Sequence, residues 1–394
     1  MPSDPLDWNP VLTVFCCLAA FAIGFLWNLL ATFPGMRRLR RAANAHWSER
    51  ARLVHPYRGA AGVVATYLPV SLTLALQMVA YPPMGAVIAT ACIGSAGAIL
   101  GSFPLSRLLD PSFSWRAWPV AFRFWQHPML LVWAMVAAMP ARMGPMAWGA
   151  VALLLGWVAL VNLRPARFAI GKAQRIPTPP DLEARARALA QEANAPLRAV
   201  HVVRHGAPNA WAFPVSSEVV VSEKLVQHLT TAEMDSILRH EMDHLREPSA
   251  MTWARIVAGH AHLALLFAKP AVFAFGIPGL VPLMLAWLLV PIGVGHWIRR
   301  FETRADAHGS SVDPATYATA LLKLHELGFI PAVIEGKSTH PNLYDRLLAC
   351  GVTPDFERPK PANLLTLGAV LPSVAFGILV VVSLEQWLKA ARLS

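Results

Sequence analysis

The chain carries little charge for its length. Of its 394 residues only 14% are Asp, Glu, Lys or Arg, whereas 55% are hydrophobic and the mean hydropathy is +0.45. This apolar surplus is larger than a soluble domain of this size needs for its core, and a lipid bilayer accounts for it. The shortage of charge therefore excludes an ordinary soluble protein and predicts an α-helical polytopic membrane protein.

Cysteine is also scarce, and the first residues lack the cationic stretch of a secretion signal. Residues 1–9 contain Asp4 and Asp7 instead, so we expect no cleaved signal peptide and a first span that stays in place. The four cysteines have no metal-binding or redox spacing, and most lie inside apolar runs: Cys16, Cys17, Cys92 and Cys350. No disulfide framework is expected.

Long apolar runs predict the membrane spans. They lie near residues 11–33, 60–80, 84–104, 146–163, 277–297 and 364–386. Weaker candidates lie at 120–140, which contains Arg123, and at 252–275, which contains Arg255, His260, His262 and Lys269. The total is about eight spans, with the weaker pair uncertain.

The basic residues lie beside these spans. A formal charge of +11 is compatible with nucleic-acid binding, but the membrane explains the positions of the basic residues better, so no nucleic acid is expected. Arginines crowd the loop after the first span: Arg37, Arg38, Arg40, Arg41, Arg50, Arg52 and Arg58. This loop should be cytoplasmic, and alternation then places 105–126, 164–250 and 299–362 on the same side. The membrane would be the inner membrane in a bacterium.

The composition divides the chain into three parts. Residues 1–163 form a transmembrane region of about five spans, and 363–394 form a last span and tail. Residues 164–362 have the composition of an α/β domain, interrupted by a two-span hairpin near 252–297. Within this domain we predict a helix over 182–194, strands over 199–203, 210–213 and 218–222, and helices near 299–309 and 313–327.

The most informative motif is His240-Glu241-Met242-Asp243-His244, an HExxH pattern. On a helix it places two imidazoles one turn apart, about 6 Å along the axis, with a carboxylate between them. Thr230 and Glu233 form a capping-box pattern before it, and an apolar stripe follows the same helix. The residue types predict the ligands of a catalytic zinc ion, His240 and His244, with Glu241 as the general base.

Catalytic zinc takes three protein ligands, so a further donor is required. Glu302, after the hairpin, is the candidate third ligand. Asp306 lies four residues later on the same helix face, where its carboxylate can accept a hydrogen bond from a ligand imidazole.

Simpler interpretations apply to several of these residues. An isolated HExxH is often a solvated polar face of a helix. At its variable positions, Met242 is expected to pack and Asp243 to face solvent. His325-Glu326 resembles a second copy, but Phe329 replaces the second histidine, so we interpret it as a surface helix end. His260 and His262 either approach the zinc site from below or hydrogen-bond a neighbouring helix.

The motifs together resemble the membrane-embedded zinc metalloproteases that include the CAAX prenyl protease and HtpX. The matching pieces cover about 180–350 in the family's order: Asn209 to Phe213, the strand at 218–222, the HExxH motif, Glu302 with Asp306, and His340-Pro341 followed by Arg346. The resemblance implies a zincin-like fold in which Asn209 and Ala210 lie on an edge strand that pairs with a peptide. It also implies that His340 and Arg346 approach the zinc and hold the substrate or its oxyanion.

The predicted function is that of a zinc-dependent metalloendopeptidase of the HExxH-plus-Glu (gluzincin) type, with one Zn²⁺ per chain. Its partners would be the lipid bilayer and a peptide or membrane-protein substrate, either membrane-associated or unfolded. A catalytically silent zinc-binding regulator or sensor, and a transport protein in which the motif is incidental, remain alternatives. Neither the oligomeric state nor the natural substrate is predicted.

Overall fold

The computed structural model describes residues 8–80, 82–111, 127–163, 175–204, 207–334, 340–363 and 366–393. Within these ranges, five helices are long and apolar enough to cross a membrane: Pro10–Arg41, Trp47–Val79, Met84–Gly101, Pro145–Asn162 and Ile277–Gly309. The pair Ser249–Gly259 and Ala261–Phe275 adds a sixth crossing if its 47° bend is counted within one span. The structure thus has an α-helical membrane region, as the composition predicts.

The amino-terminal region is a bundle of long helices. It comprises α1 (Pro10–Arg41), α2 (Trp47–Val79), α3 (Met84–Gly101) and the short α4 (Phe103–Leu109), and α17 (Leu367–Leu393) packs against it. Glycines let α1 and α3 approach closely, because a Cβ atom on Gly97 or Gly101 would lie 2.2 Å from a carbonyl oxygen of α1. The GxxxG step of α3 is therefore a packing feature.

A second group of helices lies beside this bundle. It contains α6 (His127–Ala138), α7 (Pro145–Leu163), α12 (Ser249–Gly259), η2 (Ala261–Phe267), α13 (Ala268–Phe275), η3 (Ile277–Gly279) and the first part of α14 (Leu280–Gly309). The weak candidate at 120–140 appears as α6, and Arg123 lies outside the described residues. The other weak candidate, 252–275, is the bent pair of helices.

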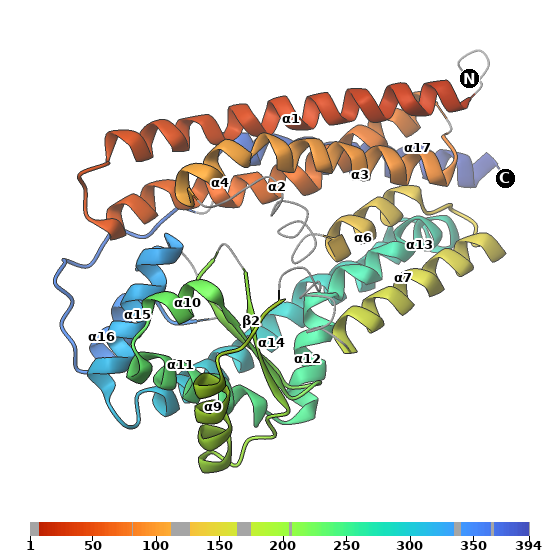
Figure 1. Cartoon of the computed structure of the whole chain (residues 1–394). Coiled ribbons are helices and arrows are strands. Elements are labelled where there is room, and N and C mark those ends of the chain that lie inside the picture. The colour runs from red at the N-terminus through yellow and green to blue at the C-terminus, as the bar shows by residue number, and fades with distance from the viewer. Residues whose placement is uncertain are drawn as a thin grey trace.

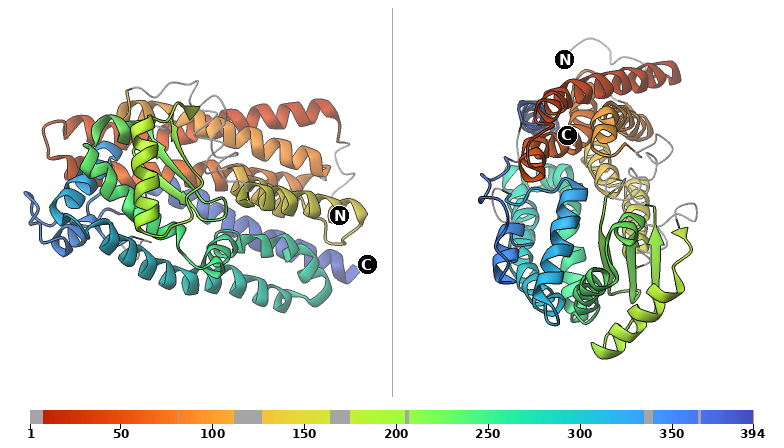
Figure 2. Two further views of the ribbon diagram at one scale, coloured as in Figure 1. Left: turned by 60° about the horizontal axis from the view of Figure 1, so that its bottom comes forward. Right: turned by 60° about the vertical axis from the view of Figure 1, so that its left-hand side comes forward.

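The helices run between two ends of the molecule (Figure 1). Both chain termini lie at one end, and the mixed α/β domain lies at the other; the left view of Figure 2 shows the same separation. The turn between α1 and α2 is at the domain end (Figure 1). The arginines predicted to lie in a loop are in the end of α1 and the start of α2, and they therefore share one end of the helical region with the α/β domain.

The α/β domain contains a small mixed sheet. Its strands are β1 (Arg175–Ile176), β2 (Ala199–Val203), β3 (Ala210–Phe213) and β4 (Glu218–Ser222), in the order β1-β2-β4-β3. β2 and β4 are parallel, whereas β3 is antiparallel to β4 and lies at an edge. The predicted strands at 199–203, 210–213 and 218–222 are confirmed at those bounds.

Helices cover the sheet and form the core with it. They are α9 (Pro180–Glu192), α10 (Glu223–His228), α11 (Thr231–Leu245), α15 (Pro314–Gly328) and α16 (Leu343–Ala349). Val219 and Val221 of β4 pack in one apolar cluster with Leu238 and Met242 of α11 and Leu321 of α15, and all of them are at most 2% exposed. The sheet therefore supports α11, the helix that carries the HExxH motif.

One finding differs from the prediction for the end of the hairpin. The span at 277–297 and the helix at 299–309 form a single helix, α14, of 30 residues. Between Trp297 and Phe301 there is no proline or glycine, and the residues Ile298-Arg299-Arg300 favour helix, so nothing ends the helix there. As a result, a membrane helix extends directly into the α/β domain.

Polar contacts fasten this extension to α11. Arg304 Nε donates to Asp243 Oδ2 at 2.7 Å, and His308 Nδ1 lies 3.0 Å from the carbonyl oxygen of Arg239. The expectation that Asp243 faces solvent is therefore wrong, since the residue is 4% exposed and paired with an arginine of α14. Met242 packs in the core as expected.

Candidate metal centre

The helix α11 begins with the predicted capping box. The Thr230 side chain accepts a hydrogen bond from the backbone N–H of Glu233, and the Glu233 carboxylate accepts one from the backbone N–H of Thr230. Lys323 Nζ also donates to Glu233 at 2.7 Å. The cap satisfies backbone donors that the first turn leaves unpaired. It therefore fixes where the helix starts, and with it the side of the helix on which His240 and His244 lie.

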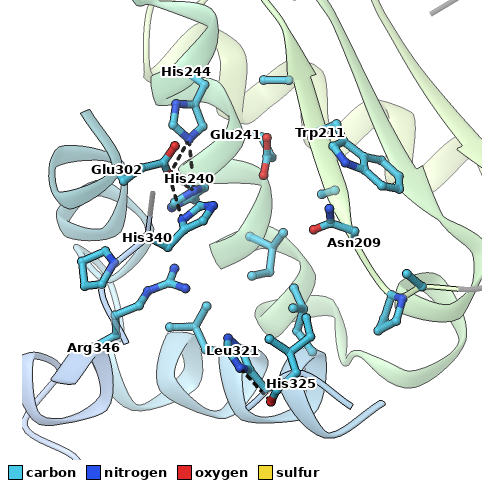
Figure 3. Close-up of a pocket in the computed structure, with 18 of the residues that line it drawn as sticks. Asn209, Trp211, His240, Glu241, His244, Glu302, Leu321, His325, His340 and Arg346 are labelled. Atoms are coloured by element: carbon cyan, nitrogen blue, oxygen red, sulfur yellow. Dashed lines mark hydrogen bonds and ion pairs between the residues drawn. The ribbon is translucent and has the colours of Figure 1, made fainter. Parts of the chain in front are cut away.

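Three side chains converge at the end of α11 and the carboxyl-terminal part of α14 (Figure 3). His240 Nε2 and His244 Nε2 lie 3.2 Å apart, and Glu302 Oε2 lies 3.7 Å from the first and 3.3 Å from the second. Donors about 2.05 Å from a tetrahedral zinc ion are about 3.3 Å from one another. The three side chains are nearly buried, and their separations fit such an ion.

The electrostatics of this cluster also favour a cation. Each histidine has a carboxylate beside its Nδ1 atom, which requires the ring proton there and leaves an Nε2 lone pair toward the cluster. Glu302 Oε2 is buried, and the nearest side-chain nitrogens in the described part of the chain belong to His340 and His244, at 3.0 and 3.3 Å. Acceptor atoms at this separation repel one another unless a proton or a metal ion lies between them.

The hydrogen bonds behind His240 involve residues from three other helices. His240 Nδ1 lies 3.1 Å from Asp306 Oδ1 and 3.0 Å from the Tyr317 hydroxyl. Arg346 binds both carboxylate oxygens of Asp306, at 2.8 and 2.6 Å. Burial raises the pKa of Asp306, but His240 and Arg346 outweigh it and hold that pKa below its usual range. Asp306 is therefore a carboxylate that orients the His240 ring.

A matching arrangement lies behind His244. Its Nδ1 is 2.6 Å from Glu247 Oε1, and Arg255 Nη2 donates to the same oxygen at 2.6 Å. Burial lowers the pKa of His244, but hydrogen bonds with Glu247 and Glu302 raise it to about 10. In the absence of a metal, this ring holds a proton that a bound cation must displace.

The cluster opens into a cavity of about 740 Å³ between α11, α15 and β3. Glu241 lines it, and its carboxylate lies between the cluster and the side of the cavity where Asn209 and Trp211 lie (Figure 3). The whole of β3, from Ala210 to Phe213, lines the same cavity. An extended peptide beside the edge strand would thus pass both Glu241 and the three converging side chains.

His340 and Arg346 occupy different positions relative to the cluster. His340 is half exposed, and its Nδ1 lies 3.0 Å from Glu302 Oε2, the converging oxygen itself. Arg346 lines the cavity but directs Nε and Nη2 to Asp306, so it contacts the residue behind His240. That either of them holds the substrate or its oxyanion stays a prediction.

Other histidines are placed differently from the predictions. His325 is at the end of α15, but it lines the cavity, and burial lowers its pKa to about 3. The surface position expected for it is therefore wrong. His260 and His262 are not among the residues that line this cavity, and His262 Nε2 has no hydrogen-bond partner in the described part of the chain.

Sequence reasoning missed Tyr317, Glu247 and Arg255. Glu247 follows His244 by three residues, and this spacing was the available signal for an orienting carboxylate. Tyr317 and Arg255 belong to no sequence pattern, so only the packing of α15 onto α11 and of α12 onto α14 reveals them.

The fold and the cluster together define a helical membrane protein whose α/β domain carries a candidate His/His/Glu metal site. Residues 178–350 match the model of peptidase family M48, so the chain carries an M48 domain and the resemblance inferred from the motifs is confirmed. The chain is 28% identical over 165 residues to a "Protease HtpX homolog" of Burkholderia cenocepacia and 32% identical over 167 residues to one of Acidiphilium cryptum. Each match covers 38% of this chain and 57% of the relative, so the chain spans little more than half of the relatives' length.

Proposed function

We propose that the protein is a zinc-dependent membrane metalloendopeptidase that hydrolyses peptide bonds in membrane-associated or unfolded protein substrates. The observation that carries this proposal is the convergence of His240 Nε2, His244 Nε2 and Glu302 Oε2 in a cavity that Glu241 and the edge strand β3 also line. In this proposal His240, His244 and Glu302 hold one Zn²⁺ per chain, a gluzincin ligand set.

Zinc, when bound, supplies a Lewis acid that polarises the scissile carbonyl and lowers the pKa of water. Glu241 accepts one proton from the attacking water as the water oxygen bonds to the carbonyl carbon. It then delivers this proton to the amide nitrogen, the C–N bond breaks, and a carboxylic acid and an amine leave; the second water proton, still on the acid, passes to the amine, which gives the carboxylate and ammonium products. Asp306 and Glu247 hold the two imidazoles in orientation during these steps.

The substrate would bind as an added strand. β3 is at an edge of the sheet, and both its first residue, Ala210, and Asn209 directly before it line the cavity. Backbone hydrogen bonds to β3 would then supply affinity for many sequences, because they do not depend on side chains. His340 and Arg346, at the opposite wall, are the candidates for contact with the oxyanion.

A comparison of Glu241→Gln with the wild-type protein tests this function. Glutamine keeps the shape of the side chain but accepts no proton, so cleavage of unfolded casein should fall at least about 100-fold while zinc content stays at one ion per chain. Glu326→Gln, an exposed change in the second His-Glu pair, is the matched control and should leave both unchanged.

The remaining outcomes separate the alternatives. Wild-type activity in Glu241→Gln would remove Glu241 as the base. Stoichiometric zinc without hydrolysis of casein or of a farnesylated peptide by the wild type would favour a silent zinc-binding regulator. Absence of zinc from the purified protein would make the motif incidental.

A further inference from the structure

Tyr317 is a buried tyrosine that touches the metal centre from behind. Its side chain, on α15, is 1% exposed and is among the largest fully buried side chains described. A Cβ atom on Gly309, at the end of α14, would lie 2.7 Å from Tyr317 Cε2. The glycine therefore leaves the space that the tyrosine ring occupies against the helix of Glu302 and Asp306.

The hydroxyl of Tyr317 bridges four helices. It lies 3.0 Å from His240 Nδ1 on α11, 2.8 Å from Asp306 Oδ1 on α14 and 3.1 Å from Arg346 Nη2 on α16. No other hydroxyl group contacts a histidine of the cluster in the described residues. A group with this many partners restrains all of them at once.

Counting protons fixes the direction of each hydrogen bond. Arg346 can only donate, so the tyrosine oxygen accepts from Nη2, and Asp306 as a carboxylate can only accept, so the single hydroxyl proton goes to Oδ1. No proton is left for the contact with His240. The imidazole must therefore donate from Nδ1, which leaves the Nε2 lone pair on the side of His244 and Glu302.

We propose that Tyr317 is a positioning residue of the metal centre, whose hydroxyl holds His240 in the Nδ1–H tautomer with Nε2 aimed at the metal. This inference rests on the proposed function, because it takes the metal to be zinc at the converging atoms. Asp306 imposes the same tautomer, but it is shared with Arg346, and Tyr317 supplies the second acceptor that fixes the tilt of the ring.

Tyr317→Phe tests the role of the hydroxyl, because phenylalanine keeps the ring against Gly309 and removes one oxygen atom. Zinc affinity, measured by competition with a chromophoric chelator, should weaken about tenfold. The visible absorption spectrum of the Co²⁺-substituted protein should change, since it reports the ligand geometry directly. Activity lost at limiting zinc should return at saturating zinc.

Tyr344→Phe is the matched control. Tyr344, on α16 of the same domain, packs its ring against Phe356 and Arg358, so its hydroxyl should affect neither zinc affinity nor the cobalt spectrum. The inference fails if Tyr317→Phe binds zinc as tightly as the wild type with an unchanged cobalt spectrum. It also fails if the metal-free variant loses its fold, because the hydroxyl would then serve stability. A wild-type protein that binds no zinc would instead refute the proposed function.

Discussion

At the scale of single residues, each imidazole of the cluster has a carboxylate beside its Nδ1 atom. Asp306 contacts His240, Tyr317 and Arg346, and Glu247 contacts His244 and Arg255. In each case a carboxylate receives the Nδ1 proton of the imidazole while an arginine offsets its charge. The two imidazoles are thus oriented by the same chemistry from different elements.

Asp306→Asn should damage both metal binding and stability. The amide removes the charge that pairs with buried Arg346, at a cost of about 3 kcal/mol in the free energy of unfolding. It also allows the Tyr317 proton to turn toward His240 Nδ1, which favours the wrong tautomer, so zinc affinity should fall about 10- to 100-fold. Chemical denaturation and chelator competition measure the two effects.

The surface pair of Asp345 and Arg358 supplies the control for this change. Both side chains are nearly half exposed, so Asp345→Asn should cost less than about 1 kcal/mol and leave zinc affinity unchanged. Equal effects of the two substitutions would mean that Asp306 has no special link to the metal centre.

Among the elements, the start of α11 gives a prediction about pH. Burial raises the pKa of Glu233, but Lys323 and Thr230 outweigh it and lower that pKa below its usual value. A carboxyl whose pKa is lower in the folded state stabilises the fold above its unfolded pKa of about 4.3 and loses this contribution as pH falls through the folded value. Glu233→Gln should therefore destabilise the protein by about 1 kcal/mol at pH 7 and by much less below pH 4.

Thr230→Ala distinguishes this effect from a general loss of the cap. The threonine hydroxyl does not titrate, so its removal should cost a similar amount at both pH values. Unfolding midpoints of both variants at pH 7 and at a pH well below 4 provide the measurement. A destabilisation of Glu233→Gln that persists unchanged at low pH would contradict the assignment.

Element boundaries could be predicted where local chemistry marks them. The strands β2, β3 and β4 lie between turn residues such as Pro208, Pro214 and Ser216, and both their type and their bounds followed from that pattern. The bend between α12 and η2 was not predicted, since no glycine or proline stands between the helices other than Gly259 at the end of α12. A bend of this kind depends on neighbouring helices.

For the whole molecule, the arrangement predicts a single polarity in the membrane. The α/β domain and the turn between α6 and α7 are at opposite ends of the helical region (Figure 1). In a background without Cys16, Cys17, Cys92 and Cys350, a membrane-impermeant thiol reagent should label Gly144→Cys in intact cells. Ser311→Cys, on the domain side, should react only after permeabilisation, because the positive loops favour the cytoplasm.

Both outcomes of this labelling are informative. The glycine site tolerates a side chain, since a Cβ atom there would have no neighbour within 4 Å, and Ser311 is exposed. The reversed pattern would place the domain outside the cytoplasm. Labelling of both positions in intact cells would contradict the separation of the two ends.

The sequence by itself determined the membrane class, the strands and the local geometry of the HExxH helix. These depend on composition, on turn residues and on the helical repeat, all of which act over a few residues. Glu302 was predicted because catalytic zinc needs a third protein ligand, and Asp306 because it lies four residues later, on the same face of the helix.

Only the tertiary structure decided the distances at the metal centre and the partners behind each ligand. Glu302 is separated from His244 by the hairpin, and Tyr317, Arg346 and Arg255 come from further helices. Their contacts depend on how α14 and α15 pack against α11, α16 against α15, and α12 against α14. Packing of elements that are distant in sequence depends on the shape and charge of many side chains at once, and no local pattern in the chain records it.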